Sequence, residues 1–120
     1  KALKNGVVFY YLADEDLGIE NSVFENFFDE KKSTLTSISK ISSLSNASVL
    51  PCINHYCQES KKYITYIGEP LKNFPSNNLQ KDANTINIAL EKIILRDIEQ
   101  YMWSLRLFQT RPAGKRYPYQ

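Results

Sequence analysis

The sequence has few of the side chains that most enzymes use for catalysis. Its 120 residues include one histidine, two cysteines and four glycines. Four scattered glycines exclude a glycine-rich phosphate-binding loop. Side chains alternate along a strand, so Cys52 and Cys57 are predicted on opposite faces, which argues against a metal site shared with His55 and against a Cys–His nucleophile pair. We predict a surface or packed histidine and two reduced, buried cysteines, since two are too few for a disulfide framework.

Long apolar runs are also absent. No stretch approaches the roughly 18 apolar residues of a membrane-spanning helix, and no signal peptide is visible. Any membrane association is therefore expected from a surface or from sequence outside the chain. The first residues, "KALKNG", carry no initiator methionine and resemble the last turn of a helix that ends at Gly6, so we expect further sequence upstream.

The charges are unevenly placed along the chain. The net charge of +2 is too small to indicate nucleic-acid binding by itself. Residues 5–30 contain seven acidic residues and no basic one, whereas residues 105–120 contain four basic residues and no acidic one. The basic end would attract anions, but the acidic stretch argues against a nucleic-acid partner.

Hydrophobic patterning predicts one α/β domain. Residues 7–12, "VVFYYL", form a continuous apolar run typical of a strand buried on both faces. Apolar residues three or four positions apart predict the helices, and side chains that alternate between two faces predict the strands. The further predicted elements are a short helix over 22–28, a helix over 33–48, strands over 47–57 and 61–71 joined by a turn at 58–61, and a helix over 83–97 capped by Asp82. Strands alternating with helices favour a sheet flanked by helices.

Two groups of residues are candidates for chemistry. Asp14 and Asp16 follow the first predicted strand, where carboxylates two positions apart point the same way and could hold a metal, a hydroxyl or an arginine. The alternative is an acidic turn leading to Gly18. The tail combines Tyr and Trp, which suit a water–lipid boundary, with arginines, which bind phosphate through a two-pronged guanidinium. A phosphorylated lipid would fit this tail, but so would a segment whose aromatics cap the core and whose bases are solvated.

Four segments of the sequence resemble the C-terminal part of the bacterial lipid A biosynthesis acyltransferases, the lauroyl and myristoyl transferase family. The segments are "FYYLADEDLG", "SVFENFF", "STLTSISKISSLSNASVLP" and "EQYMWSLRLFQTRPAG". The residues that match the family's motifs are Asp14, Asp16 and Gly18; Ser22, Val23, Phe24, Phe27 and Phe28; Thr34 and Thr36; Ser45, Ala47 and Pro51; and Glu99, Gln100, Tyr101, Trp103, Arg106, Phe108, Thr110, Arg111, Pro112 and Gly114. The resemblance covers nearly all of the chain.

The resemblance implies an enzyme that moves a fatty acyl chain from acyl carrier protein to a hydroxyl of a lipid A precursor at the cytoplasmic face of the bacterial inner membrane. It implies the α/β fold of glycerophosphate-type acyltransferases, with no metal or organic cofactor. Related enzymes use a histidine with an acidic residue five positions later, but Ser60 stands five positions after His55. The catalytic pair and the membrane anchor are therefore expected upstream, and residues 1–120 would be the inactive C-terminal portion of one acyltransferase domain.

The resemblance also implies roles for seven residues. Asp14 and Asp16 would organise the active-site floor by pairing with an arginine, and Arg106 and Arg111 would bind phosphate or a buried carboxylate. Aromatic rings would line an acyl groove, since a fatty chain requires an apolar trough; these are Phe24, Phe27 and Phe28. Family residues are replaced at Asn54, His55, Tyr56, Ile98 and Gln109. The competing interpretation is an inactive remnant or a small module that binds anionic ligands.

Overall fold

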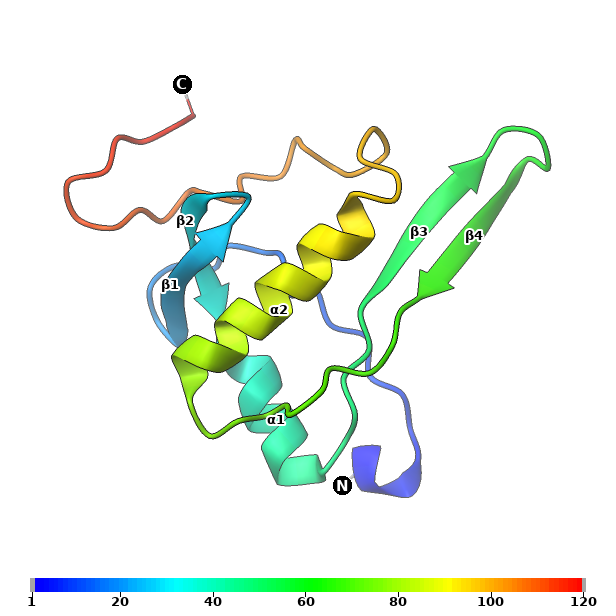
Figure 1. The fold of residues 1–120 in the computed structure, drawn as a ribbon, viewed down its shortest axis with the longest axis horizontal. Helices are drawn as coiled ribbons and strands as arrows, with labels where there is room; N and C mark the ends of the chain where they lie inside the picture. The colour runs from blue at the N-terminus through cyan, green and yellow to red at the C-terminus, as the bar shows by residue number, and fades with distance from the viewer. Residues whose placement is uncertain (1, 120) are drawn as a thin grey trace.

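The computed structural model describes residues 2–119 and contains two hairpins and two α-helices (Figure 1). In chain order the elements are a short 3-10 helix (Leu3–Asn5), β1 (Ser22–Phe27), β2 (Glu30–Leu35), α1 (Ser37–Ser45), β3 (Cys52–Cys57), β4 (Lys62–Ile67) and α2 (Leu79–Ile94). After α2 the chain continues through turns and coil. Each hairpin forms its own two-stranded antiparallel sheet, so the predicted mixture of helices and strands is confirmed, but the described residues form two separate sheets.

The first hairpin replaces a predicted helix. Residues 22–28 were expected to be helical, but Ser22 pairs with Leu35 and Phe27 with Glu30 across an antiparallel ladder. The two turn residues Phe28 and Asp29 have φ of 48° and 64°, the positive values that a tight two-residue hairpin requires. The helix prediction was wrong because the three phenylalanines fit one face of a helix as well as they fit a strand. Only the pairing with β2 distinguishes the helix from the strand.

Helix α1 is shorter than predicted. It spans Ser37–Ser45, whereas the sequence favoured a helix over 33–48. Residues 33–35 belong to β2 instead, where Thr34 is fully buried. The β-branched threonine suits a strand, and the ladder with β1 supplies its backbone partners.

The second hairpin confirms the predicted strands and turn. Cys52 pairs with Ile67 and Cys57 with Lys62, so the turn lies at residues 58–61. All six residues of β4 are exposed, and the hairpin extends away from α2 in Figure 1. Both cysteines are free, as predicted, but they are half-buried rather than buried.

The apolar run over residues 7–12 does not form the predicted strand. These residues are in coil, and Val8 is 91% exposed. A strand needs hydrogen-bonding neighbours on its edges, and within residues 2–119 no strand pairs with this run. Its composition therefore predicted burial that the described part of the chain does not provide.

Helix α2 packs its apolar side against β1 and β2. It begins earlier than expected, at Leu79, because Asn78 is the N-cap: its side chain accepts the Lys81 N–H at 3.0 Å. Asp82, the predicted cap, is instead buried inside the first turn. The core combines Ile94 of this helix with Phe27 and Leu107, and Ile86 and Ile93 are also buried, as their spacing predicted.

A buried polar contact fixes α2 on the first hairpin. Asn87 has no exposed surface and donates through Nδ2 to the Asn26 carbonyl at 2.8 Å and to Thr34 Oγ1 at 2.9 Å. An amide inside the protein is stable only when it is hydrogen-bonded, so these contacts set one position of the helix along the strands.

Candidate functional site

The loop that contains Asp14 and Asp16 lies against the C-terminal segment. Asp14 Oδ2 accepts a hydrogen bond from the Tyr101 hydroxyl at 2.8 Å. Asp16 Oδ2 accepts the Thr110 N–H at 2.6 Å, and its Oδ1 accepts the Gly18 N–H at 3.1 Å. Two sequence motifs separated by 87 to 94 positions therefore meet at one place.

Serine hydroxyls fix the other end of this loop to the first hairpin. The Gly18 carbonyl accepts from Ser33 Oγ at 2.6 Å and from Ser22 Oγ at 2.8 Å. Gly18 has φ of +99°, a backbone conformation that side chains with a Cβ rarely adopt. The spacing Asp-x-Asp-x-Gly thus serves a loop that turns sharply after its second carboxylate.

A buried lysine lies near the two carboxylates. Lys32 has no exposed surface; its Nζ donates to the Ser33 carbonyl at 3.2 Å and lies 5.9 Å from the centre of the Phe27 ring. Burial lowers its pKa to about 8, although the charges of Asp16 and Asp14 act in the opposite direction. Lys32 is thus a buried positive charge close enough to act on the acidic loop, and the pairing of that loop with an arginine stays a prediction.

Sequence reasoning missed Lys32 because "EKKS" resembles a solvated turn. Lys32 and Thr34 share one face of β2 and are fully buried, but Ser33 and Leu35 on the other face are buried as well, so alternation along the strand does not single out Lys32. Lys31, on the other face, is partly exposed and pairs with Glu25 at 3.3 Å.

Tyr101 connects the acidic loop to the core aromatics. Burial raises the pKa of its hydroxyl, and the hydrogen bond to Asp14 and the charge of Asp14 raise it further, so the group stays protonated as a donor at neutral pH. Its ring meets Trp103 edge-on with centroids 4.9 Å apart. Trp103 Nε1 donates to the Ile98 carbonyl at 2.7 Å. Trp103 is 48% exposed, so Tyr101 closes the core more fully than Trp103 does.

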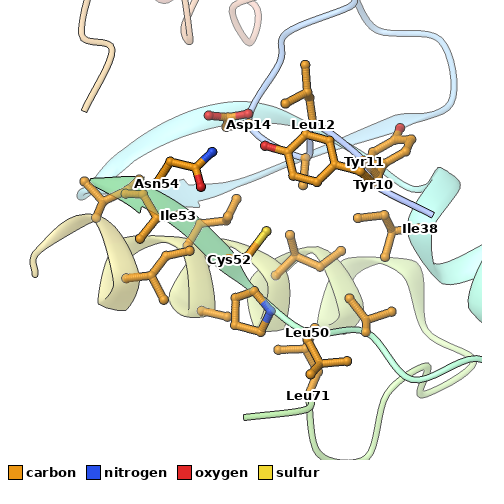
Figure 2. A pocket seen from close by; sticks show the side chains of 18 of the residues that line it. Tyr10, Tyr11, Leu12, Asp14, Ile38, Leu50, Cys52, Ile53, Asn54 and Leu71 are labelled. Carbon is orange, nitrogen blue, oxygen red and sulfur yellow. The ribbon is translucent and has the colours of Figure 1, made fainter. Parts of the chain in front are cut away.

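A cavity of about 170 Å³ opens beside Asp14 and Tyr101. Its walls are mostly aliphatic and aromatic side chains from residues 10–14, α1, residues 49–54 and α2. Figure 2 shows Asp14 and Leu12 on one side of it, Leu71 on the other, and the Cys52 thiol between them. The polar groups of the loop thus stand at the edge of an apolar space, an arrangement that suits a ligand with a polar group and a hydrocarbon part.

Comparison with known proteins identifies the family. The profile of the bacterial lipid A biosynthesis acyltransferases matches residues 1–110. The chain belongs to this family. It is 38% identical over 113 residues to a lipid A biosynthesis acyltransferase of Haemophilus influenzae, covering 94% of this chain and 35% of that protein. It is 35% identical over 115 residues to the lipid A biosynthesis lauroyltransferase of Escherichia coli, covering 95% and 38%.

A third relative extends the comparison to another acyl group. The chain is 29% identical over 119 residues to the lipid A biosynthesis myristoyltransferase of Escherichia coli, covering 99% of this chain and 37% of that protein. The chain therefore spans between 35% and 38% of the length of these curated relatives. No solved structure matches the chain at a significant level.

The three phenylalanines matched to the family lie away from the cavity. Phe27 has no exposed surface, and its ring centroid is 4.8 Å from that of Phe28 and 6.4 Å from that of Phe108. Phe28 also contacts Trp103, and Phe24 is half-buried on β1. None of these three phenylalanines lines the cavity beside Asp14, so their acyl-binding role stays a prediction.

The two predicted arginines occupy different surroundings. Arg111 Nη2 pairs with Glu30 Oε2 at 2.8 Å and Nη1 donates to the Lys31 carbonyl at 3.2 Å, so its guanidinium fastens the tail to the first hairpin. The hydrogen bond from Arg111 to Glu30 lowers the pKa of the Glu30 carboxyl. Arg106 is exposed. A role for either arginine in phosphate binding stays a prediction.

His55 has an acidic partner that the sequence did not reveal. Its Nδ1 contacts Asp97 Oδ2, and Gln100 Nε2 lies 3.2 Å from the same nitrogen. Gln100 also bonds the Tyr56 backbone N–H at 2.8 Å, which ties β3 to the segment after α2. The pair is separated by 42 positions, so only the fold brings it together.

Residues 2–119 contain neither a metal-binding cluster nor a membrane-spanning helix. No group of three His, Cys, Asp or Glu side chains in this part of the chain is arranged to hold a metal ion. Nor does any helix of the same residues have the length and apolar character needed to cross a membrane.

Proposed function

We propose that this chain works as the C-terminal part of an acyltransferase that moves a fatty acyl group from acyl carrier protein to a hydroxyl of a lipid A precursor. The reaction would take place at the cytoplasmic face of the bacterial inner membrane. Membership of the lipid A acyltransferase family supports this activity. The observation that carries the proposal is the apolar cavity at whose edge Asp14 binds Tyr101.

The cavity would hold a segment of the acyl chain. Aliphatic cavities of about 150 Å³ bind a benzene ring, so about 170 Å³ suits roughly six carbons and not a complete long chain. Each buried methylene contributes about 0.8 kcal/mol, so this segment would supply about 5 kcal/mol of binding free energy. The thioester end of the acyl group would then lie toward Asp14 and Tyr101. The hydrogen bond between these two residues would hold the acidic loop between the bound acyl group and the lipid A precursor.

The proton-abstracting histidine and acid would come from polypeptide outside residues 1–120, in a glycerophosphate-acyltransferase-like sheet. Exposed apolar surface supports an extension of the fold: Val8 and Tyr63 are 91% and 78% exposed. The outer edge of β4, whose six residues are all exposed, can accept a further strand. In such a domain the role of this chain is to hold the acyl segment and the acidic loop.

Cysteine alkylation tests the acyl site directly. Dodecanoic acid bound in the cavity is expected to slow the reaction of Cys52 with N-ethylmaleimide about sixfold when its free concentration is five times Kd. Cys57 does not line the cavity and provides an internal control whose rate should stay constant. Mass spectrometry of the two cysteine peptides measures both rates. Equal protection of both thiols, or protection of neither, would contradict an acyl site here.

Loss of charge on the acidic loop tests the active-site role. In the complete acyltransferase, Asp14→Asn is expected to lower acyl transfer about tenfold or more, because the loop loses the anion that accepts the Tyr101 hydroxyl. The matched control Glu20→Gln removes an exposed acid from the same loop and should keep wild-type turnover. Transfer of radiolabelled acyl groups to the lipid A precursor measures the rate. Unchanged turnover in Asp14→Asn would refute the role.

A further inference from the structure

The position of the second hairpin decides the shape of the cavity beside Asp14. Cys52, Ile53 and Asn54 of β3 form part of the cavity wall, and α2 and Tyr101 form other parts. The hairpin is a separate two-stranded sheet with all six residues of β4 exposed, and such a hairpin is marginally stable on its own in water. Ile53 packs against the core cluster, which fixes one point of β3. A second contact is needed to fix the direction of the strand.

Gln100 binds the backbone of β3 as a neighbouring strand would. Its Oε1 accepts the Tyr56 N–H at 2.8 Å, and its Nε2 donates to the Tyr56 carbonyl at 3.0 Å. A residue in an antiparallel ladder exchanges the same two bonds with its partner. Gln100 directly precedes Tyr101, which lines the cavity and donates to Asp14. One side chain thus connects the β3 wall of the cavity to the wall at Tyr101.

Two further contacts act beside Gln100. Asp97 Oδ2 contacts His55 Nδ1 on β3, and Gln100 Nε2 lies 3.2 Å from the same nitrogen. The Arg96 guanidinium lies 3.8 Å from the centre of the Tyr66 ring on β4. Gln100 and Arg96 are exposed, and Asp97 is half-buried. Contacts exposed to water contribute little to the free energy of unfolding, but they can still favour one position of a hairpin over another.

We propose that Gln100 and Asp97 are positioning residues for the acyl site, which hold β3 against the segment after α2 so that the cavity keeps the shape that fits a hydrocarbon chain. This role depends on the acyl site proposed above. Neither side chain lines the cavity, so neither would touch the acyl group. Both act through β3: when their contacts are lost, β3 is displaced in part of the population, and the apparent Kd of a ligand rises as the inverse of the competent fraction.

Substitution of Gln100 by methionine tests this role, because methionine keeps the length of the side chain and loses both bonds to Tyr56. Gln100→Met and Asp97→Leu are each expected to weaken the binding of dodecanoic acid about fivefold, as measured by protection of Cys52 from N-ethylmaleimide. The melting temperature of each variant should stay within about 3 °C of wild type, since the lost contacts are at the surface. In the complete acyltransferase, Gln100→Met should raise KM for the acyl donor about fivefold and keep kcat within about twofold.

Gln58→Met is the matched control. Gln58 is exposed at the turn of the same hairpin, away from the segment after α2, so its variant should keep the affinity for dodecanoic acid within about twofold. Unchanged affinity in Gln100→Met or Asp97→Leu, equal weakening in Gln58→Met, or a lower kcat with unchanged KM would overturn the positioning role, while protection of Cys52 in the wild type still supported the acyl site. Absence of protection in the wild type would refute the acyl site and the positioning role with it.

Discussion

The unfolding free energy of the wild-type chain, measured relative to a Lys32→Met variant, should rise by about 2 kcal/mol between pH 7.5 and pH 10. The pKa of Lys32 is about 8 in the folded chain, whereas the ordinary value for a lysine is 10.5. Between these values the unfolded chain binds a proton that the folded chain has released. Because the unfolded state binds more protons, stability increases with pH in this window.

Urea denaturation at several pH values measures this difference. Tyr101 is present in both proteins; its raised pKa acts in the opposite direction, giving stability that is lost only as the pH rises above 10, and largely cancels in the comparison. Lys31→Met is the matched control, since it removes the neighbouring partly exposed lysine and should follow the wild-type pH dependence. Parallel curves for wild type and Lys32→Met would show that Lys32 keeps an ordinary pKa and is not buried as described.

Phe27→Ala is expected to lower the unfolding free energy by about 4 kcal/mol. The ring is fully buried with Ile94 and Leu107 and contacts the Phe28 ring at 4.8 Å, so alanine would leave a cavity in the centre of the core. Denaturant titration followed by circular dichroism measures the change. If the variant does not fold, Phe27→Leu, with an expected loss of about 1.5 kcal/mol or less, keeps the test informative.

The exposed Phe9 provides the control for this prediction. It is 56% exposed, so Phe9→Ala should change the unfolding free energy by no more than about 0.5 kcal/mol. If Phe27 lined an acyl groove instead, Phe27→Ala would weaken acyl binding while leaving stability nearly unchanged. That result would contradict the core position and support the role implied by the family resemblance.

Local signals predicted the elements that depend on residues close in sequence. The second hairpin needed only alternating side chains around a short turn, and the centre of α2 needed only the spacing of Ile86, Ile93 and Ile94. The boundaries were less certain. Asn78 and Asp82 are both good helix-capping residues, and only the bond to the Lys81 N–H decides for Asn78.

Motif spacing predicted the acidic loop but not its partners. Asp14 and Asp16 were candidates because of their spacing and their neighbour Gly18, yet the sequence suggested an arginine beside them. The fold brings Tyr101 and Thr110 to the carboxylates and buries Lys32 nearby, and an arginine partner stays a prediction. Tyr101 and Thr110 are far from the acidic loop in sequence. Lys32 belongs to a pair of adjacent lysines, a pattern that is typical of a solvated surface.

The sequence by itself determined the family, the second hairpin, the centre of α2 and the acidic loop, because each depends on residue types at short, fixed spacing. Within residues 2–119, tertiary structure decided that residues 22–27 form a strand, that residues 7–12 do not, and that the Ser39 hydroxyl has no hydrogen-bond partner. It also decided which residues surround the cavity beside Asp14. In these cases strand pairing, burial and hydrogen-bond satisfaction depend on groups distant in the chain, so periodicity and composition alone could not decide them.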